Sequence, residues 1–226
     1  MTIFRRILAT TAFTALVASS AMATTILTAV QTQSVSNLMT NDSLTNLTFA
    51  KFDSSLGTLT SVHFTLSGTE NTGYTVTDIS ASANNFTFFN DVTVFLKSGS
   101  TTLTTVLPQI STTGSLVANG TTTSTGYPAL NLTSTVASGD VLYTDAPTLS
   151  LFNGPGSIIL TSSGHSNNGF SASGDVNQTV VTRYSGTATV QYDYFVADTG
   201  TPEPATMALM GSALLGLGLL RKKTRS

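Results

Sequence analysis

The clearest indication of the fold is the segment Val190-Gln191-Tyr192-Asp193-Tyr194-Phe195-Val196-Ala197. From Val190 onward every second residue up to Val196 is a β-branched or aromatic residue, and the first two residues between them are polar. The same period of two recurs in Ser61-Val62-His63-Phe64-Thr65-Leu66. Such alternation is typical of β-strands with one buried face. The body of the chain is therefore expected to consist of strands.

Similar β-branched and aromatic runs elsewhere in the chain predict further strands at residues 47–52, 74–79, 92–96, 141–143, 158–161 and 179–184. Turn-forming residues lie between the strands, at 53–57, 67–68, 98–100, 138–140, 153–156 and 185–186. Residues 111–124 are expected to form a long surface loop or a weak edge strand. We see no sustained helical period outside the two ends. The expected fold is all-β, an antiparallel β-sandwich of jelly-roll or Ig-like type.

The composition excludes several classes of protein. Only 9% of the 226 residues are charged, and there is no Cys, which rules out disulfides, thiolate metal sites and a cysteine nucleophile. Six of the nine basic residues lie in the terminal segments, so residues 24–201 hold three bases against ten acids, a net charge of −7. A body so poor in cations is unsuited to nucleic acid or to an anionic membrane surface.

The first 23 residues have the features of a secretory signal peptide. Arg5 and Arg6 precede a short apolar run at 7–17, and Ala21-Met22-Ala23 supplies the small residues of a cleavage site. Signal peptidase is expected to cut after Ala23, between the Ala21-x-Ala23 site and Thr24. An ordinary N-terminal core helix is the less favoured alternative.

The last segment, residues 201–226, has the features of a membrane-inserted tail. Residues 205–220 are uncharged, and sixteen residues of helix reach about 24 Å, slightly less than a hydrocarbon core of about 30 Å. The basic stop cluster Arg221, Lys222, Lys223 and Arg225 follows. A single transmembrane helix with a cytoplasmic C-terminus is therefore expected, since basic residues favour the cytoplasmic side.

Pro202-Glu203-Pro204 stands immediately before this apolar run. The order of Pro-Glu-Pro, short apolar helix and terminal basic cluster resembles the PEP-CTERM sorting signal of Gram-negative bacteria. The resemblance implies that an exosortase recognises the tail and that the protein passes to the cell surface or to exopolysaccharide. The two prolines fix φ and keep the segment extended, as a protease substrate needs to be. The alternative is a stiff linker in front of a permanent anchor.

The body, residues 24–200, also resembles a known family. Residues 51–62 and 184–194 are similar to the choice-of-anchor E domain. That family is defined by its varied C-terminal surface anchors, and the resemblance implies no catalytic role.

Residues that could carry chemistry are few. His63 falls on the polar phase of a predicted strand and His165 in a predicted loop, and both are expected to be surface residues without metal-ligand spacing. There is no G-x-S-x-G motif and no phosphate-binding loop. No catalytic residue, metal site or cofactor is therefore expected. Bound Ca²⁺ is a weak alternative to turn capping for the oxygen donors in or near predicted loops, Asp140, Asp145, Asn153, Asp175, Asn90 and Asp91.

Three functions are compatible with these features. The favoured one is an exported structural protein of the cell surface or extracellular matrix, associated with exopolysaccharide or biofilm. The second is a glycan-binding module or adhesin, for which the candidate exposed aromatics are Tyr74, Tyr127, Phe152 and Phe170. The least favoured is a secreted hydrolase, which would place His63 or His165 beside a carboxylate in a polar pocket.

Overall fold

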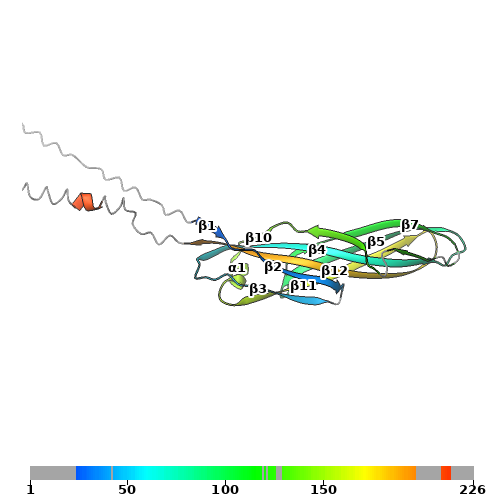
Figure 1. Ribbon diagram of the computed structural model, residues 1–226, viewed down its shortest axis with the longest axis horizontal. Coiled ribbons are helices and arrows are strands. Elements are labelled where there is room, and N and C mark those ends of the chain that lie inside the picture. The colour runs from blue at the N-terminus through cyan, green and yellow to red at the C-terminus, as the bar shows by residue number, and fades with distance from the viewer. Residues whose placement is uncertain are drawn as a thin grey trace, which may run out of the picture. The chain divides into compact units, whose positions relative to one another are not determined.

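Figure 1 shows the computed structural model of the chain, which describes residues 24–41, 43–118, 120, 122–125, 129–196 and 210–214. The chain divides into two compact units. One is Thr24–Val196, the body, and the other combines Met1–Ala23 with Ala197–Ser226. In the second unit residues 210–214 are helical. Among the described residues there is no helix with the length and apolar character needed to cross a membrane.

The body consists of two antiparallel sheets and one short helix, α1 (Ala146–Phe152). Sheet A contains β1 (Thr24–Leu27), β2 (Gln31–Met39), β4 (Thr58–Asp78), β8 (Thr122–Thr125), β9 (Leu132–Ala137), β10 (Val141–Tyr143) and β12 (Val176–Val196). Sheet B contains β3 (Leu44–Ala50), β5 (Asn84–Ser98), β6 (Thr101–Val106), β7 (Gln109–Leu116) and β11 (Ser157–Ala172). The expectation of an all-β, antiparallel sandwich is confirmed.

The strand order distinguishes between the two expected types of sandwich. In sheet A, β12 and β4 pair at the centre, with β1 and β2 along the free side of β12 and β8, β9 and β10 along the free side of β4. Sheet B has the order β3-β11-β5, and β6 and β7 both pair with β5. Strands β1 and β2 lie along the same edge and count as one interrupted strand, as do β6 with β7 and β8 with β9 and β10. Counted in this way, the body has eight strands, and six of the seven connections between them cross from one sheet to the other. This is the strand order of a jelly roll.

The inner faces of the sheets form two apolar clusters. The larger cluster includes Val62, Phe64 and Leu66, the apolar phase of the alternating segment in β4. The smaller cluster, at the other end of β4, contains Tyr74 and Val76 with partners from β5 and β7. In β12, Val190 and Tyr192 are buried as the alternation predicts. The period of two therefore identified the buried faces of both central strands, except at the end of β12, where Val196 is 43% exposed.

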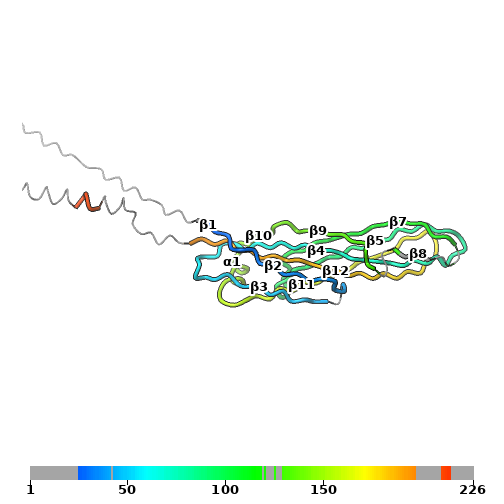
Figure 2. Tube along the Cα trace, in the orientation of Figure 1, coloured from blue at the N-terminus to red at the C-terminus, as the bar shows by residue number. Residues whose placement is uncertain are grey.

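Two predicted turns, at 67–68 and 185–186, are wrong because both dipeptides lie inside long strands. Gly68 of β4 and Gly186 of β12 are register partners in the central ladder, the pairing between β4 and β12. Figure 2 shows the paths of these two strands. A Cβ on Gly68 would lie 2.6 Å from Cγ2 of Val106 in sheet B. Gly68 therefore lets the two sheets approach closely, and its small size is not a turn signal.

Other local expectations have mixed outcomes. The loop predicted around His165 is wrong, since His165 lies within β11 and pairs with Thr93. For residues 111–116 the edge-strand alternative is right, because they belong to β7. Helix α1 was not expected; it has seven residues, too few to show a period, and Asp145 caps its N-terminus by accepting from the amide of Thr148 at 2.9 Å.

The two ends of the body are neighbours. Strand β1 pairs antiparallel with the end of β12, with Thr24 opposite Val196. The body therefore begins and ends side by side on adjacent strands of sheet A.

Candidate functional site

The sorting and processing residues expected from the sequence lie outside the described residues. These are the signal cleavage residues Ala21 and Ala23, the motif Pro202, Glu203 and Pro204, and the stop cluster Arg221, Lys222, Lys223 and Arg225. What the structure does define is where the body ends relative to them. Strand β1 begins at Thr24, the expected start of the mature chain, and five residues separate Val196 from Pro202, at most about 20 Å of extended chain. Both expected cleavage positions are thus close in sequence to the same end of the body.

Near that end, His63 of β4 lies between two carboxylates. Its Nδ1 is 2.8 Å from Oδ2 of Asp140, and its Nε2 is 2.8 Å from Oδ2 of Asp193 in β12. Ser61 donates to the same Asp193 oxygen at 2.6 Å. Only the imidazolium form carries N–H donors for both carboxylates. The cluster joins β4, β12 and the loop before β10.

The charged forms of His63 and Asp193 stabilise each other. Partial burial opposes the charged imidazole, but the hydrogen bonds with Asp193 and Asp140 nevertheless raise the pKa of His63. Burial also opposes ionisation of Asp193, yet the hydrogen bonds from His63 and Ser61 hold the pKa of that carboxyl below its usual value. The His63 side chain is 19% exposed and lies between two carboxylates, so the expectation of a surface histidine is right only in part for His63. It is right for His165, which is exposed.

A second polar cluster lies between the two apolar clusters of the core. The amide of Asn90 in β5 donates to the Glu70 carboxylate of β4 and lies 2.9 Å from the hydroxyl of Thr182 in β12. Ser166 of β11 donates to the Asn90 carbonyl at 2.8 Å. The second carboxyl oxygen of Glu70 is buried and has no partner among the described residues. Burial, partly offset by the Asn90 hydrogen bond, raises the pKa of Glu70 to about 8.

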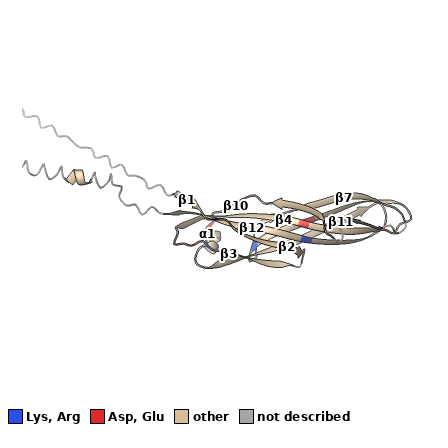
Figure 3. Ribbon diagram, viewed as in Figure 1, with Lys and Arg blue, Asp and Glu red and all other residues tan. Residues whose placement is uncertain are grey.

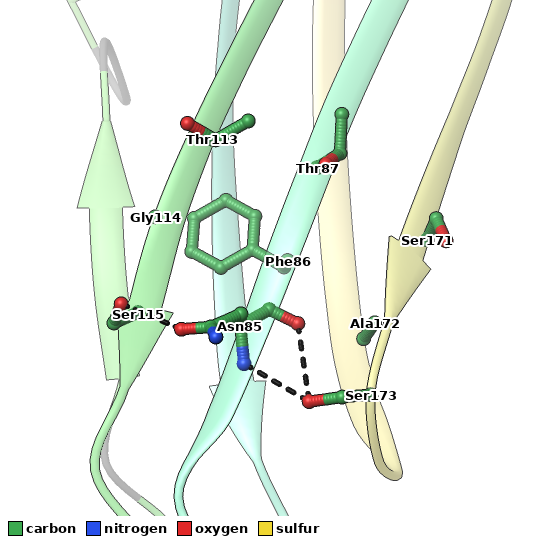
Figure 4. Close-up of a pocket in the computed structure, with 9 residues that line it drawn as sticks. All are labelled: Asn85, Phe86, Thr87, Thr113, Gly114, Ser115, Ser171, Ala172 and Ser173. Atoms are coloured by element: carbon green, nitrogen blue, oxygen red, sulfur yellow. Dashed lines mark hydrogen bonds between the residues drawn. The ribbon is translucent and has the colours of Figure 1, made fainter.

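The third feature is a groove on the outer face of sheet B, at the end of the body opposite to β1. Figure 4 shows its lining, which comes from β5, β7 and the end of β11 with the turn that follows. Its volume is about 490 Å³, and it is lined by Asn85, Phe86, Thr87, Thr113, Gly114, Ser115, Ser171, Ala172 and Ser173. Every polar side chain in this lining is an uncharged hydroxyl or amide. Such a surface can exchange hydrogen bonds with a neutral polar ligand.

Of the four aromatic residues proposed from sequence for ligand binding, the three that the structure describes do not form an exposed binding surface. Tyr74 and Phe152 are 1% and 0% exposed, because both fill the core. Phe170 packs against Tyr74 with ring centroids 5.2 Å apart, and Tyr127 lies outside the described residues. Position next to Gly, Asn or Pro was therefore a poor signal of exposure. The exposed aromatic on the groove face is Phe89, at 40% exposure, which sequence reasoning missed.

The oxygen donors considered for Ca²⁺ are spread through the body. Asp140 contacts His63, Asp145 caps α1, and Asn90 belongs to the buried cluster. Asn153 follows α1, Asp175 lies between β11 and β12, and Asp91 is in β5. Within the part of the chain that the structure describes, no group of three or more His, Cys, Asp or Glu is arranged to hold a metal ion.

Comparison with solved structures and curated proteins gives little. A chain of the T13 particle of infectious bursal disease virus is 14% identical over 84% of this chain and 47% of its own, with a TM-score of 0.17. A chain from the Gx strain of that virus is 13% identical over 86% and 50%, with a TM-score of 0.15. This chain thus spans about half the length of either, and TM-scores this low establish no shared fold. No curated protein matches.

The comparison with protein families identifies the tail. Residues 201–223 match the family described as the PEP-CTERM protein-sorting motif. The match contains Pro202-Glu203-Pro204, the apolar run and the first three basic residues of the stop cluster. The resemblance of the body to the choice-of-anchor E domain has no such support and stays a prediction. The chain carries a PEP-CTERM sorting motif at residues 201–223, and this motif indicates an exported protein that is processed by an exosortase and sorted to the cell surface.

Proposed function

We propose that this chain is the precursor of a structural protein of the bacterial surface and extracellular matrix, associated with exopolysaccharide or biofilm. Signal peptidase removes residues 1–23, and an exosortase acts at Pro202-Glu203-Pro204 while the apolar run at 205–220 holds the precursor in the membrane. The observation that carries the proposal is the sorting motif at residues 201–223, in a chain whose first 23 residues have the order of a signal peptide.

A non-catalytic role is part of the proposal. Both ring nitrogens of His63 are engaged by carboxylates, so neither is free to accept a proton from a hydroxyl. The hydroxyl of Ser61 donates to Asp193 and not to His63, so these residues do not form a nucleophile and base pair. The groove on sheet B has no titratable side chain in its lining. These arrangements favour a scaffold over a hydrolase.

A glycan-binding or adhesive role is the second candidate. The observation in its favour is the groove on sheet B, which presents hydroxyl and amide groups without charge. The two roles are compatible, because a matrix component needs a surface that contacts the matrix.

The test of the proposed function is mass spectrometry of the protein recovered from the surface of the producing cells. We expect a mature chain that begins at Thr24, contains no peptide running from Pro204 into residues 205–220, and co-purifies with exopolysaccharide. In cells that lack the exosortase, the tail should remain attached. Glu203→Ala should likewise leave the precursor membrane-bound and uncleaved. Recovery of tail peptides from wild-type surface protein would show that the tail is a permanent anchor and that the proposal is wrong.

A further inference from the structure

The outer face of sheet B has a regular cross-strand arrangement at its groove end. Thr87 of β5 is the register partner of both Thr113 in β7 and Ser171 in β11, so the three residues form one row across three strands. Two residues further along β5, Phe89 is the partner of Ser111 and Gly169 in the same way. The two rows are about 7 Å apart, since a strand rises about 3.4 Å per residue.

The hydroxyls of the first row are available. Thr113 and Ser171 are exposed and Thr87 is half-buried, and among the described residues none of the three hydroxyls makes a hydrogen bond. In the neighbouring row, by contrast, Ser115 donates to the side chain of Asn85 at 2.7 Å. The row of Thr87, Thr113 and Ser171 therefore offers three free donor and acceptor groups across the strands (Figure 4).

Phe89 supplies an aromatic surface beside this row. The Phe89 ring lies over Gly169, and a Cβ added to Gly169 would be only 2.5 Å from Cζ of Phe89. Since Gly169 has no side chain, the ring rests against the backbone of β11, and the side chain is still 40% exposed. A ring held against a sheet in this way loses little conformational freedom when a ligand packs on it.

Charge restricts what can occupy this face. Asp91, two residues beyond Phe89 on the same face of β5, is the nearest charged residue along that strand, and Lys97 is eight residues beyond Phe89. Figure 3 shows how sparse the charges of the body are, and acids outnumber bases by ten to three over residues 24–201. An anionic ligand would meet no cation in the groove and a nearby carboxylate. A neutral ligand with many hydroxyls meets matched donors and acceptors.

We infer that the groove and Phe89 together form a binding site for a neutral polysaccharide. One sugar ring packs its apolar face on Phe89, and the hydroxyls of the adjoining sugar exchange hydrogen bonds with Thr87, Thr113 and Ser171. The site deepens the proposed function, on which it rests for the presence of exopolysaccharide, by naming the face of the body and the chemical class of glycan.

The test uses the body, residues 24–200, because both core clusters and all described strand pairings lie within it. The probes are the neutral and acidic fractions of the exopolysaccharide of the producing cells, separated by anion exchange and cast into native gels. We expect the neutral fraction to retard the body and the acidic fraction to leave it unretarded. Phe89→Ala should weaken binding roughly tenfold, and the double variant Thr87→Val with Thr113→Val severalfold, because each loses a direct contact while strand shape is kept.

The matched control is Ile159→Ala, which removes a 56% exposed side chain from the same strand as Gly169, ten residues away. It should bind like the wild type. Unchanged circular dichroism and thermal unfolding of Phe89→Ala show that lost binding is not lost folding. The proposed site would be wrong if only the acidic fraction, or neither fraction, retarded the body. It would also be wrong if the neutral fraction retarded Phe89→Ala and the wild type equally. The proposed function fails separately, if the full chain does not co-purify with exopolysaccharide from cells.

Discussion

Glu70 is a carboxylic acid whose side chain is fully buried in the body. It lies in the core with one carboxyl oxygen bonded to Asn90 and the other without a partner among the described residues. An ionised carboxylate there would be poorly compensated, so the neutral acid is the form that fits the site. The Asn90 amide of sheet B also donates hydrogen bonds to the hydroxyls of Thr72 and Thr182 in sheet A. These hydrogen bonds limit the free-energy cost of burying polar groups in the core.

The stability of the body should therefore fall as the pH rises. Because burial raises the pKa of Glu70 from 4.5 to about 8, the folded state holds a proton that the unfolded state has lost. The contribution of Glu70 to the free energy of unfolding is fully present below pH 4.5 and is lost as the pH rises to 8, on the order of 5 kcal/mol in all. Glu70→Gln, a neutral side chain of the same shape, should lose this dependence and exceed the wild type in stability at pH 8.

Urea unfolding of both proteins at several values between pH 4 and pH 8 measures this difference. Near pH 4 the two should be similar, which serves as the internal control. A gap between them that stayed constant across the range would contradict the assignment of the proton to Glu70.

In the ladder between β4 and β12, the paired glycines Gly68 and Gly186 differ in how much space surrounds them. Gly68 points at sheet B, where Cγ2 atoms of Val106 and Val94 would lie 2.6 and 2.9 Å from an added Cβ. Its partner Gly186 has more room, since the nearest atom to an added Cβ would be 3.5 Å away. Both residues are glycines that follow a serine, and they lie opposite each other in the ladder. They differ only in the atoms that surround them.

Gly68→Ala should destabilise the body by about 1–3 kcal/mol, because the new methyl forces two buried valines or the sheets apart. Gly186→Ala is the matched control and should change the free energy of unfolding by less than about 0.5 kcal/mol, because its added methyl makes only ordinary contacts and removes freedom from the unfolded chain. Chemical denaturation measures both. Equal losses for the two variants would show that the spacing of the sheets is not what Gly68 protects.

These glycines also show how far sequence reasoning reached. Strand positions and buried faces follow from the local period of two, so Phe64, Leu66, Val190 and Tyr192 were correctly predicted to face the core. Strand lengths do not follow, because a Ser-Gly pair inside a strand and one in a turn have the same composition. Only the pairing of distant strands, here Gly68 of β4 opposite Gly186 of β12, decides between them.

The same limit applies to the candidate sites. The partners of His63 lie 77 and 130 residues away in sequence, and the row of Thr87, Thr113 and Ser171 exists only through strand register. No local pattern reports such pairings. The tail was predictable because its motif, apolar run and basic cluster are contiguous in sequence. Recognition of such a segment depends on the order of its residues and not on pairings between distant strands.

Across the full chain, the basic stop cluster is expected to set the depth at which the tail lies in the membrane. Each basic residue near the cytoplasmic leaflet is worth about 1 kcal/mol, so Arg221, Lys222, Lys223 and Arg225 together give about 4 kcal/mol, or roughly a thousandfold in partitioning. This attraction should hold the apolar run at one depth and keep Pro202-Glu203-Pro204 at the outer surface.

Replacing all four with Gln should therefore let the precursor be secreted whole or degraded, while Glu203→Ala stays membrane-bound. Fractionation and immunoblotting of cells expressing each variant separate the two outcomes. Normal cleavage of the four-Gln variant would show that the cluster does not position the substrate.

The neighbouring ends of β1 and β12 have a mechanical consequence. Strand β12 starts three residues after Ser173 of the groove and runs for 21 residues, about 70 Å, to Val196, where the tail departs. A drag force between a glycan held at the groove and a tether at Val196 would act along β12. It would shear the ladder with β4, which extends from Val176 opposite Asp78 to Phe195 opposite Thr58, and would load its hydrogen bonds together instead of one after another. The strand that leads to the sorting tail is thus also the one best placed to resist being pulled out.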